Sequence, residues 1–227
     1  MTFGLKKRSA ILGVTSCLLF ALLPSASHSQ GESQEVVVLR KVAVLPFLII
    51  RPQRVGQRMV KGLWGDSFFR GGDISSRAAS EVTTIFYREL VEQRRCETIP
   101  LDRTAALRER VGLNDFRRDP LGGAAQIGRE LDVHAVVIGG VYRFEQRQGS
   151  AWGVEKPASV AFDAHLVRVE DKSVLWSGRV DETQRSLSED LLKTSTFLKG
   201  GGRWVTVQKL TAIGVESVLR TFPSLAF

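Results

Sequence analysis

The sequence predicts an α/β fold in which a mixed parallel and antiparallel sheet is flanked by helices. Three observations lead to this prediction. Two long apolar segments rich in β-branched residues, 36–50 and 133–144, are typical of buried strands. Two further strands, 160–169 and 174–183, are joined at 170–173 and indicate a β-hairpin. Stretches whose apolar residues recur at helical spacing lie between and after these strands.

The first half of the predicted domain alternates strand and helix. The strand at 36–50 is broken by only two basic residues, and we expect it to be buried on both faces and to end near Pro46. The segment 51–72 holds five basic residues, five glycines and one acid, and its lack of periodicity predicts a long loop. Asp73 is expected to cap a helix whose apolar stripe ends at Leu90.

The later elements are recognised mainly by their ends. A short strand is expected at 97–100, followed by a helix with Asp102 as its cap and Gly112 as its stop. Asp119-Pro120 starts another helix, because proline is favoured at the first helical position. Two further helices are expected, one opened by a capping box at 186–189 and one over 206–220.

The amino terminus has the three-part order of a secretory signal. A basic start, 1–8, precedes an uncharged apolar stretch, 10–23, and a small polar segment, 24–30. The apolar stretch is shorter than the roughly 20 residues that a membrane-spanning helix needs. We therefore expect residues 1–29 to be a signal peptide and residues 30–227 to form a single α/β envelope domain.

The signal can be processed in two ways. Val14-Thr-Ser-Cys17 fits the pattern read by lipoprotein signal peptidase, which would leave Cys17 as a lipidated first residue. Ordinary cleavage after Ser27 or Ser29 is favoured, because the apolar stretch continues through Cys17 before it turns polar. Cys96 is then the only cysteine of the mature chain and is interpreted as a small core residue.

Composition argues against several classes of protein. The 227 residues carry 32 basic and 24 acidic side chains, a net charge of +8. Three of the basic residues lie in the first ten positions and no acid precedes Glu32, so the chain without its first thirty residues carries +5, which is too mild an excess to argue for nucleic-acid binding. The two cysteines and three histidines show no metal-ligand spacing, so no metal site is assigned. His134 and His165 are interpreted as ordinary strand histidines.

The sequence shows no catalytic or cofactor motif. It lacks the Gly-x-Ser-x-Gly of a nucleophile elbow, although the members of a Ser/His/Asp triad need not be close in sequence. Gly139-Gly140 continues as strand and therefore lacks the geometry of a dinucleotide-binding turn. We assign no catalytic residue and no cofactor, and we predict that the chain is not an enzyme.

Basic and aromatic residues are interleaved in the predicted loop 51–72. An exposed surface of this composition could contact lipid head groups, anionic envelope polymers or an acidic protein partner. The alternative is a solvated loop whose aromatic side chains fold back onto the core. The candidate partner-binding residues are Arg51, Arg54, Arg58, Lys61, Trp64, Phe68 and Phe69, together with Trp152.

Four segments resemble a broad family of bacterial envelope proteins and lipoproteins. They are Lys41-Val-Ala-Val-Leu-Pro-Phe47, the predicted helix and strand at 125–141, and the two hairpin segments 160–167 and 173–178. They resemble the "VAVLPF" strand, the helix–strand and the "vLW" hairpin of proteins similar to CsgG, the TolB amino-terminal domain and LpoB. The resemblance covers most of residues 40–220.

The resemblance implies a TolB amino-terminal-like sandwich and a role in binding or assembly in the cell envelope, without catalysis. This chain departs from the family pattern at Val133-His134, where Ala-Asp is usual, and at the hairpin turn 170–172. It shows no pore-forming hairpins of the kind that a curli channel needs.

The leading hypothesis is a non-enzymatic exported protein of the periplasm or the outer-membrane periphery that binds an envelope protein. One alternative is an exported hydrolase or small-ligand enzyme with an unrecognised site, which a deep pocket holding Asp163 or His165 beside another titratable group would favour. The other is an anionic-surface binder that associates with membranes through 51–70. The sequence does not indicate an oligomeric state.

Overall fold

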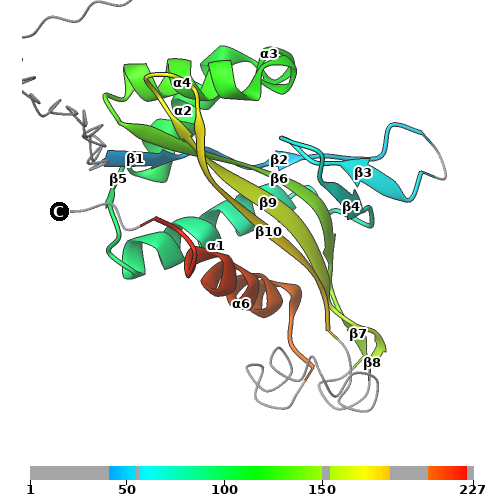
Figure 1. The fold of residues 1–227 in the computed structure, drawn as a ribbon. Coiled ribbons are helices and arrows are strands. Elements are labelled where there is room, and N and C mark those ends of the chain that lie inside the picture. Colours follow the sequence, from blue (N-terminus) through cyan, green and yellow to red (C-terminus); the bar gives the residue numbers. More distant parts are fainter. Residues whose placement is uncertain (1–40, 55–56, 150–153, 185–203, 224–227) are drawn as a thin grey trace, which may run out of the picture. The chain divides into compact units, whose positions relative to one another are not determined.

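A six-stranded mixed sheet forms the centre of the fold and lies between two groups of helices (Figure 1). The computed structural model describes residues 41–54, 57–149, 154–184 and 204–223. The strands are arranged in the order β10–β9–β6–β1–β5, and β2 pairs with β6. The α/β fold class with a mixed sheet is confirmed.

The parallel part of the sheet is built around β6. Its strands are β1 (Lys41–Val44), β2 (Leu48–Ile49), β5 (Glu97–Thr98) and β6 (Ala135–Glu145). Val42 and Ala43 of β1 lie in different core clusters and are both fully buried. Coverage of both faces explains the continuous apolar run of this strand. Pro46, which has no N–H to donate, lies in the break between β1 and β2.

The antiparallel part of the sheet consists of β9 (Ser159–Arg168) and β10 (Val174–Thr183). β9 pairs with β6 on one side and with β10 on the other, so the predicted hairpin is confirmed. Successive side chains of a strand point to opposite faces of the sheet. Phe162 and Ala164 therefore join the core on one face, whereas Asp163 and His165 lie on the other.

Helices cover the two faces unequally (Figure 1). The helices are α1 (Ala78–Glu92), α2 (Leu101–Val111), α3 (Leu113–Arg118), α4 (Pro120–Glu130) and α6 (Val207–Leu219). α1 and α6 bury one face of the sheet, with Phe86 and Leu210 in the shared core. α4 buries part of the other face through Ile127, which packs with Val136 of β6.

Two predicted helix ends are confirmed by their geometry. The Asp119 carboxylate caps α4 by accepting a hydrogen bond from the Gly122 N–H at 2.9 Å, and Pro120 occupies the first turn. Gly112 ends α2 with a φ of 77°, a backbone conformation that favours glycine. These local signals were sufficient because each acts within one turn of its own helix.

The predicted cap of the first helix is wrong. α1 begins at Ala78 and has no side-chain cap, whereas Asp73 lies before it and pairs with Lys156 at 3.4 Å. Ile74 fits the helical spacing of the apolar residues, but it forms an isolated parallel bridge with Phe144 at the sheet. An apolar residue at the right spacing therefore extended the predicted helix by about one turn too many.

Two smaller expectations also need correction. α2 begins at Leu101 after Pro100, so Asp102 lies inside the first turn, where its negative charge faces the positive end of the helix dipole. His134 lies just before β6 rather than within a strand. Its side chain is exposed, and its Nδ1 accepts a hydrogen bond from the Lys41 N–H at 3.3 Å.

The largest correction concerns the predicted loop 51–72, which contains a second, small sheet. β3 (Met59–Lys61) and β4 (Phe68–Arg70) pair as an antiparallel hairpin. Outside this segment, β7 (Gln148–Gly149) pairs with β8 (Val154–Lys156) in another two-stranded sheet. Strands of two or three residues are too short to show a reliable alternating pattern. Residues 36–40 of the predicted first strand and the predicted helix from 186 lie outside the described residues.

Cys96 has the structural role that its isolation predicts. Its side chain is buried in the core with α1 and forms no disulfide. Burial raises the pKa of the Cys96 thiol from 9.0 to about 11, so the thiol is protonated at neutral pH. Within the described residues, no helix combines the length and apolar character needed to cross a bilayer.

Candidate functional site

The β3–β4 hairpin, residues 59–70, has a docked face and an outer face. Val60 pairs with Phe69, and both side chains are buried against Tyr142 and Ala161 of the large sheet. This pair is the docked face. Alternation along the strands exposes the neighbouring side chains. The outer face consists of Met59, Lys61, Phe68 and Arg70, with Trp64 in the turn.

Aromatic stacking holds the docked face in place. The Phe69 ring lies parallel to the Tyr142 ring, with 4.0 Å between their centroids. The Arg179 guanidinium lies 4.4 Å from the Phe69 centroid, and the same group donates a hydrogen bond to the Phe68 carbonyl at 2.7 Å. Phe69 thus contacts a residue of β6 and a residue of β10, which fixes the hairpin across three strands of the sheet.

A buried carboxylate connects the sheet to the turn of the hairpin. Asp163 accepts hydrogen bonds from the Tyr142 hydroxyl at 2.8 Å and from the Gly140 N–H at 2.9 Å. The Leu63 N–H donates to the Tyr142 oxygen at 2.6 Å and lies 3.3 Å from Asp163 Oδ2. Burial, followed by the charge of Asp163, raises the pKa of Tyr142 above its ordinary range. The phenol therefore remains a donor to the carboxylate.

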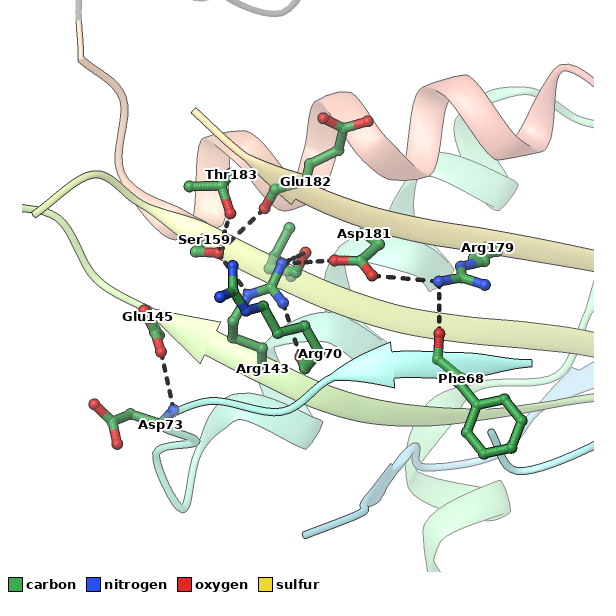
Figure 2. A network of polar contacts seen from close by, with 11 residues as sticks. Phe68, Arg70, Asp73, Arg143, Glu145, Ser159, Arg179, Asp181, Glu182 and Thr183 are labelled. Atoms are coloured by element: carbon green, nitrogen blue, oxygen red, sulfur yellow. Dashed lines mark hydrogen bonds and ion pairs between the residues drawn. The ribbon is translucent and has the colours of Figure 1, made fainter. Parts of the chain in front are cut away.

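A second buried network holds the end of β4 (Figure 2). The Arg143 side chain is only 6% exposed. Its guanidinium donates hydrogen bonds to Ser159 Oγ at 2.5 Å, to the Arg70 carbonyl at 2.8 Å and to Asp181 Oδ1 at 2.7 Å. The Asp181 carboxylate also pairs with Arg179 at 3.3 Å. Arginine side chains from the sheet thus bind two backbone carbonyls of β4, which explains how so short a strand is held.

Ser177 on β10 lies beside His165 on β9, and His165 lies beside Asp163 on the same strand. These residue types also form hydrolytic triads. Ser177 Oγ lies 2.8 Å from His165 Nδ1, and His165 Nε2 lies 3.3 Å from Asp163 Oδ2. The His165 Nε2 atom makes no hydrogen bond, because its direction to Asp163 is unfavourable. Asp163 is already bound by Tyr142, and neither it nor His165 lines a described cavity. The geometry is that of a structural network between strands.

The outer face of the hairpin gathers exposed apolar side chains. Met59, Trp64 and Phe68 are 47%, 43% and 50% exposed. Among the large hydrophobic residues that the structure describes, only Val91, on α1, is comparably exposed at 40%. A cluster of this kind on one short element marks a contact surface more strongly than scattered apolar residues would.

The predicted basic residues lie on the hairpin or in the segment that precedes it. Arg51, Arg54 and Arg58 are exposed in the segment that leads to β3, and Arg51 donates to the Ile74 carbonyl at 3.4 Å. Lys61 lies 3.5 Å from Asp66, and both side chains are well exposed, so this pair adds little stability. The structure therefore brings Arg58, Lys61, Trp64 and Phe68 to one hairpin.

Phe69 is the exception among the candidates that the structure describes. It was expected on the partner-binding surface, but the structure buries it completely. The reason is alternation: Phe68 and Phe69 are neighbours on one strand, so only one of them can face outward. Trp152 and Cys17 lie outside the described residues.

The buried polar residues that hold the hairpin were not identified as a group from the sequence. Tyr142 and Arg143 interrupt the apolar strand β6, and Asp163 interrupts β9. Charged side chains inside a buried strand require partners, because an unpaired buried charge is costly. This signal shows that partners exist, although it does not show which segment supplies them. In the described part of the chain, no group of three or more metal-ligating side chains occurs.

Comparisons with known proteins find similar folds at low sequence identity. The chain is similar to the PelC dodecamer from Paraburkholderia phytofirmans, with 13% identity, a TM-score of 0.44, and coverage of 80% of this chain and 86% of that chain. It is also similar to lipoprotein GNA1162 from Neisseria meningitidis, with 13% identity, a TM-score of 0.44, and coverage of 71% of this chain and 93% of that chain. A third similar structure is the LpoB C-terminal domain from Salmonella enterica, with 16% identity, a TM-score of 0.39, and coverage of 66% of this chain and 87% of that chain. No protein-family model and no curated protein matches the sequence.

Proposed function

We propose that this protein is an exported, non-enzymatic accessory protein of the bacterial cell envelope that binds a protein partner through the outer face of the β3–β4 hairpin. The observation that carries the proposal is the exposure of Met59, Trp64 and Phe68 together on one element. The signal-like residues 1–29 and the family-like segments within 40–220 support an envelope location, in the periplasm or at the outer-membrane periphery.

The residue types of the outer face favour a protein over a lipid surface. Aromatic residues, Met and Arg are enriched in protein–protein interfaces and dominate their binding energy. Membrane-surface binding is typically performed by an amphipathic helix with one broad apolar face. Here the exposed apolar side chains lie on strands of three residues, and Lys61 and Arg70 stand directly across from Phe68 and Met59. Such a surface suits a small apolar pocket on a partner.

The backbone of the hairpin is already ordered in the unbound protein. The stack of Phe69 on Tyr142 and the bonds from Arg143 and Arg179 fix its backbone before any partner arrives. A surface that is ordered in advance loses less conformational entropy on association. Residues 51–70 contain five basic residues and one acid, so the partner is expected to present acidic side chains around its apolar pocket.

Site-specific photo-cross-linking in intact envelopes tests the proposal. A photoreactive residue replaces Phe68 in one form and Val91 in another, because both positions are exposed but lie on different elements. A discrete protein adduct from position 68 that is absent from position 91 identifies the candidate partner. The purified candidate is then titrated against the wild type, the Trp64→Ser/Phe68→Ser form and the Val91→Ser form.

We expect the hairpin substitutions to weaken the affinity at least about tenfold, and Val91→Ser to leave it unchanged. The proposal fails if no protein is recovered from position 68. It also fails if the hairpin variant binds the purified candidate as tightly as the wild type. Salt-sensitive binding to anionic vesicles, without a protein adduct, would instead identify the hairpin as a membrane-surface binder.

A further inference from the structure

We infer that the cavity between the end of β4 and the start of β9 is a binding site for a compact oxyanion, either a carboxylate or a phosphate group. The cavity has a volume of about 320 Å³ and is lined by residues of the five strands β4, β6, β8, β9 and β10 and their connections. Its lining residues are Arg70, Gly71, Arg143, Glu145, Lys156, Pro157, Ser159 and Thr183. The cavity shares Arg70 with the outer face of the hairpin, but the inference rests on the cavity's own residues and does not depend on partner binding.

Two arginine residues, Arg70 and Arg143, line the cavity. Figure 2 shows Arg70 and Arg143 directed toward Ser159. Arg143 comes from the buried sheet, whereas Arg70 is exposed at the end of the hairpin. Two adjacent guanidinium groups repel each other unless a negative charge lies near both of them. The available carboxylates therefore decide whether the cavity is already neutralised.

The carboxylates near the cavity are already paired with cations other than Arg70. Asp181 binds Arg143 at 2.7 Å and also contacts Arg179. Glu145 pairs with Lys156 at 3.2 Å. No carboxylate of the described residues pairs with Arg70. Arg70 is thus the cation of this cavity that lacks a counter-charge.

The donors of the cavity suit oxygen atoms. A guanidinium has five N–H groups. Arg143 donates to four acceptors, namely Ser159 Oγ, Asp181 Oδ1 and the carbonyls of Arg70 and Val160, so one N–H remains. That N–H is on Nη1, which otherwise bonds only to the Arg70 carbonyl. The Arg70 guanidinium, which pairs with no carboxylate of the described residues, adds a planar fork of N–H donors, and such a fork can bind a carboxylate or phosphate in a bidentate manner.

Two hydroxyl groups complete the site. Ser159 Oγ lies 2.6 Å from Thr183 Oγ1 and 3.4 Å from the Glu182 carbonyl oxygen, and both Ser159 and Thr183 line the cavity. A hydroxyl can donate or accept, so the Thr183 hydroxyl can donate to an added acceptor while Ser159 still accepts from Arg143 and donates to the Glu182 carbonyl. The cavity volume accommodates a phosphate or carboxylate together with a small part of the molecule that carries it.

Titration of the purified chain with inorganic phosphate and with acetate tests the inference. Chloride at equal ionic strength is the reference, and the readout is the proton and nitrogen chemical shift of the Arg143 Nε–H, which is buried and hydrogen-bonded. We expect a saturable shift with phosphate or acetate and none with chloride, and the tighter of the two probes identifies the ligand class. The Arg70→Gln form should bind about tenfold more weakly. The matched Arg54→Gln form, at an exposed arginine outside the cavity, should bind as the wild type does.

Three results would overturn the inference. One is the absence of a saturable shift with either oxyanion. Another is an equal loss of affinity in the Arg70→Gln and Arg54→Gln forms, which would show a general charge effect. The third is binding that Arg70→Gln leaves unchanged, which would show an adventitious ion only. Since the probes are small ions, none of these results depends on whether the hairpin binds a protein.

Discussion

The neighbouring residues Phe68 and Phe69 allow the assignment of a docked face and an outer face to be tested by one pair of substitutions. We predict that Phe69→Ala lowers the free energy of unfolding by about 3–4 kcal/mol, whereas Phe68→Ala lowers it by about 1 kcal/mol or less. Both changes remove the same atoms from the same strand, and both keep the backbone carbonyl that binds Arg179. The difference therefore measures the side chain's environment alone.

The magnitudes follow from the burial of each ring. Phe69 is fully buried between the Tyr142 ring at 4.0 Å and the Arg179 guanidinium at 4.4 Å. Truncating a buried Phe to Ala typically costs about 3–5 kcal/mol, because it combines lost transfer energy with a cavity. Part of this cost, about 0.5–1.5 kcal/mol, is the aromatic stack. Phe68 is half exposed and gives up much less apolar contact on truncation.

Urea unfolding followed by far-ultraviolet circular dichroism gives the two free energies. Trypsin digestion under native conditions tests the same idea locally, because Lys61 and Arg70 flank the hairpin turn. We expect faster cleavage there in Phe69→Ala than in Phe68→Ala, since loss of the stack lowers the cost of undocking the hairpin. If the two variants differ by less than about 0.5 kcal/mol and are cleaved equally fast, the hairpin is not docked through Phe69.

Three further predictions concern pH, capping and processing. Burial raises the pKa of Cys96 from 9.0 to about 11 and raises the pKa of Tyr142 from 10.0 to above its ordinary range, so the fold favours both protonated forms. The stability from Cys96 is fully present below pH 9 and should be lost as pH rises from 9 through 11, whereas the stability from Tyr142 should begin to fall from about pH 10; chemical unfolding at pH 8, 10 and 11 will detect the loss, and Tyr142→Phe should reduce it above pH 10. Asp119→Ala removes the hydrogen bond to the α4 backbone and should lower the free energy of unfolding by about 1 kcal/mol. Asp102→Ala changes a first-turn position that does not cap α2, and it should lower the free energy of unfolding by less than half of that amount. Equal thermal shifts in the two variants would contradict the capping assignment. Cys17→Ser should leave the mature mass and the cellular location unchanged if ordinary signal cleavage operates, and accumulation of the precursor would instead show that the protein is a lipoprotein.

The candidate site was only partly visible in the sequence. The interleaving of Trp64 and Phe68 with basic residues drew attention to the segment 51–72, and the structure exposes both of these aromatic side chains. The pattern could not show which aromatic residue faces outward, since that depends on the register of strands too short to be recognised. The anchoring residues Arg143 and Asp163 were visible as polar interruptions of apolar strands, but their partners were not.

The sequence by itself determined the elements whose signals are local or continuous. β1 is recognised by the apolar run 42–50, the β9–β10 hairpin by two strands joined at a polar turn, and the start of α4 by Asp119-Pro120. Only the tertiary structure decided that residues 59–70 form a hairpin. Its turn is held by bonds from Leu63 to Tyr142 and Asp163, which lie 79 and 100 positions further along the chain. A three-residue strand pair cannot offset the entropy of its own ordering, so it exists only because distant residues bind it, and no local pattern records that.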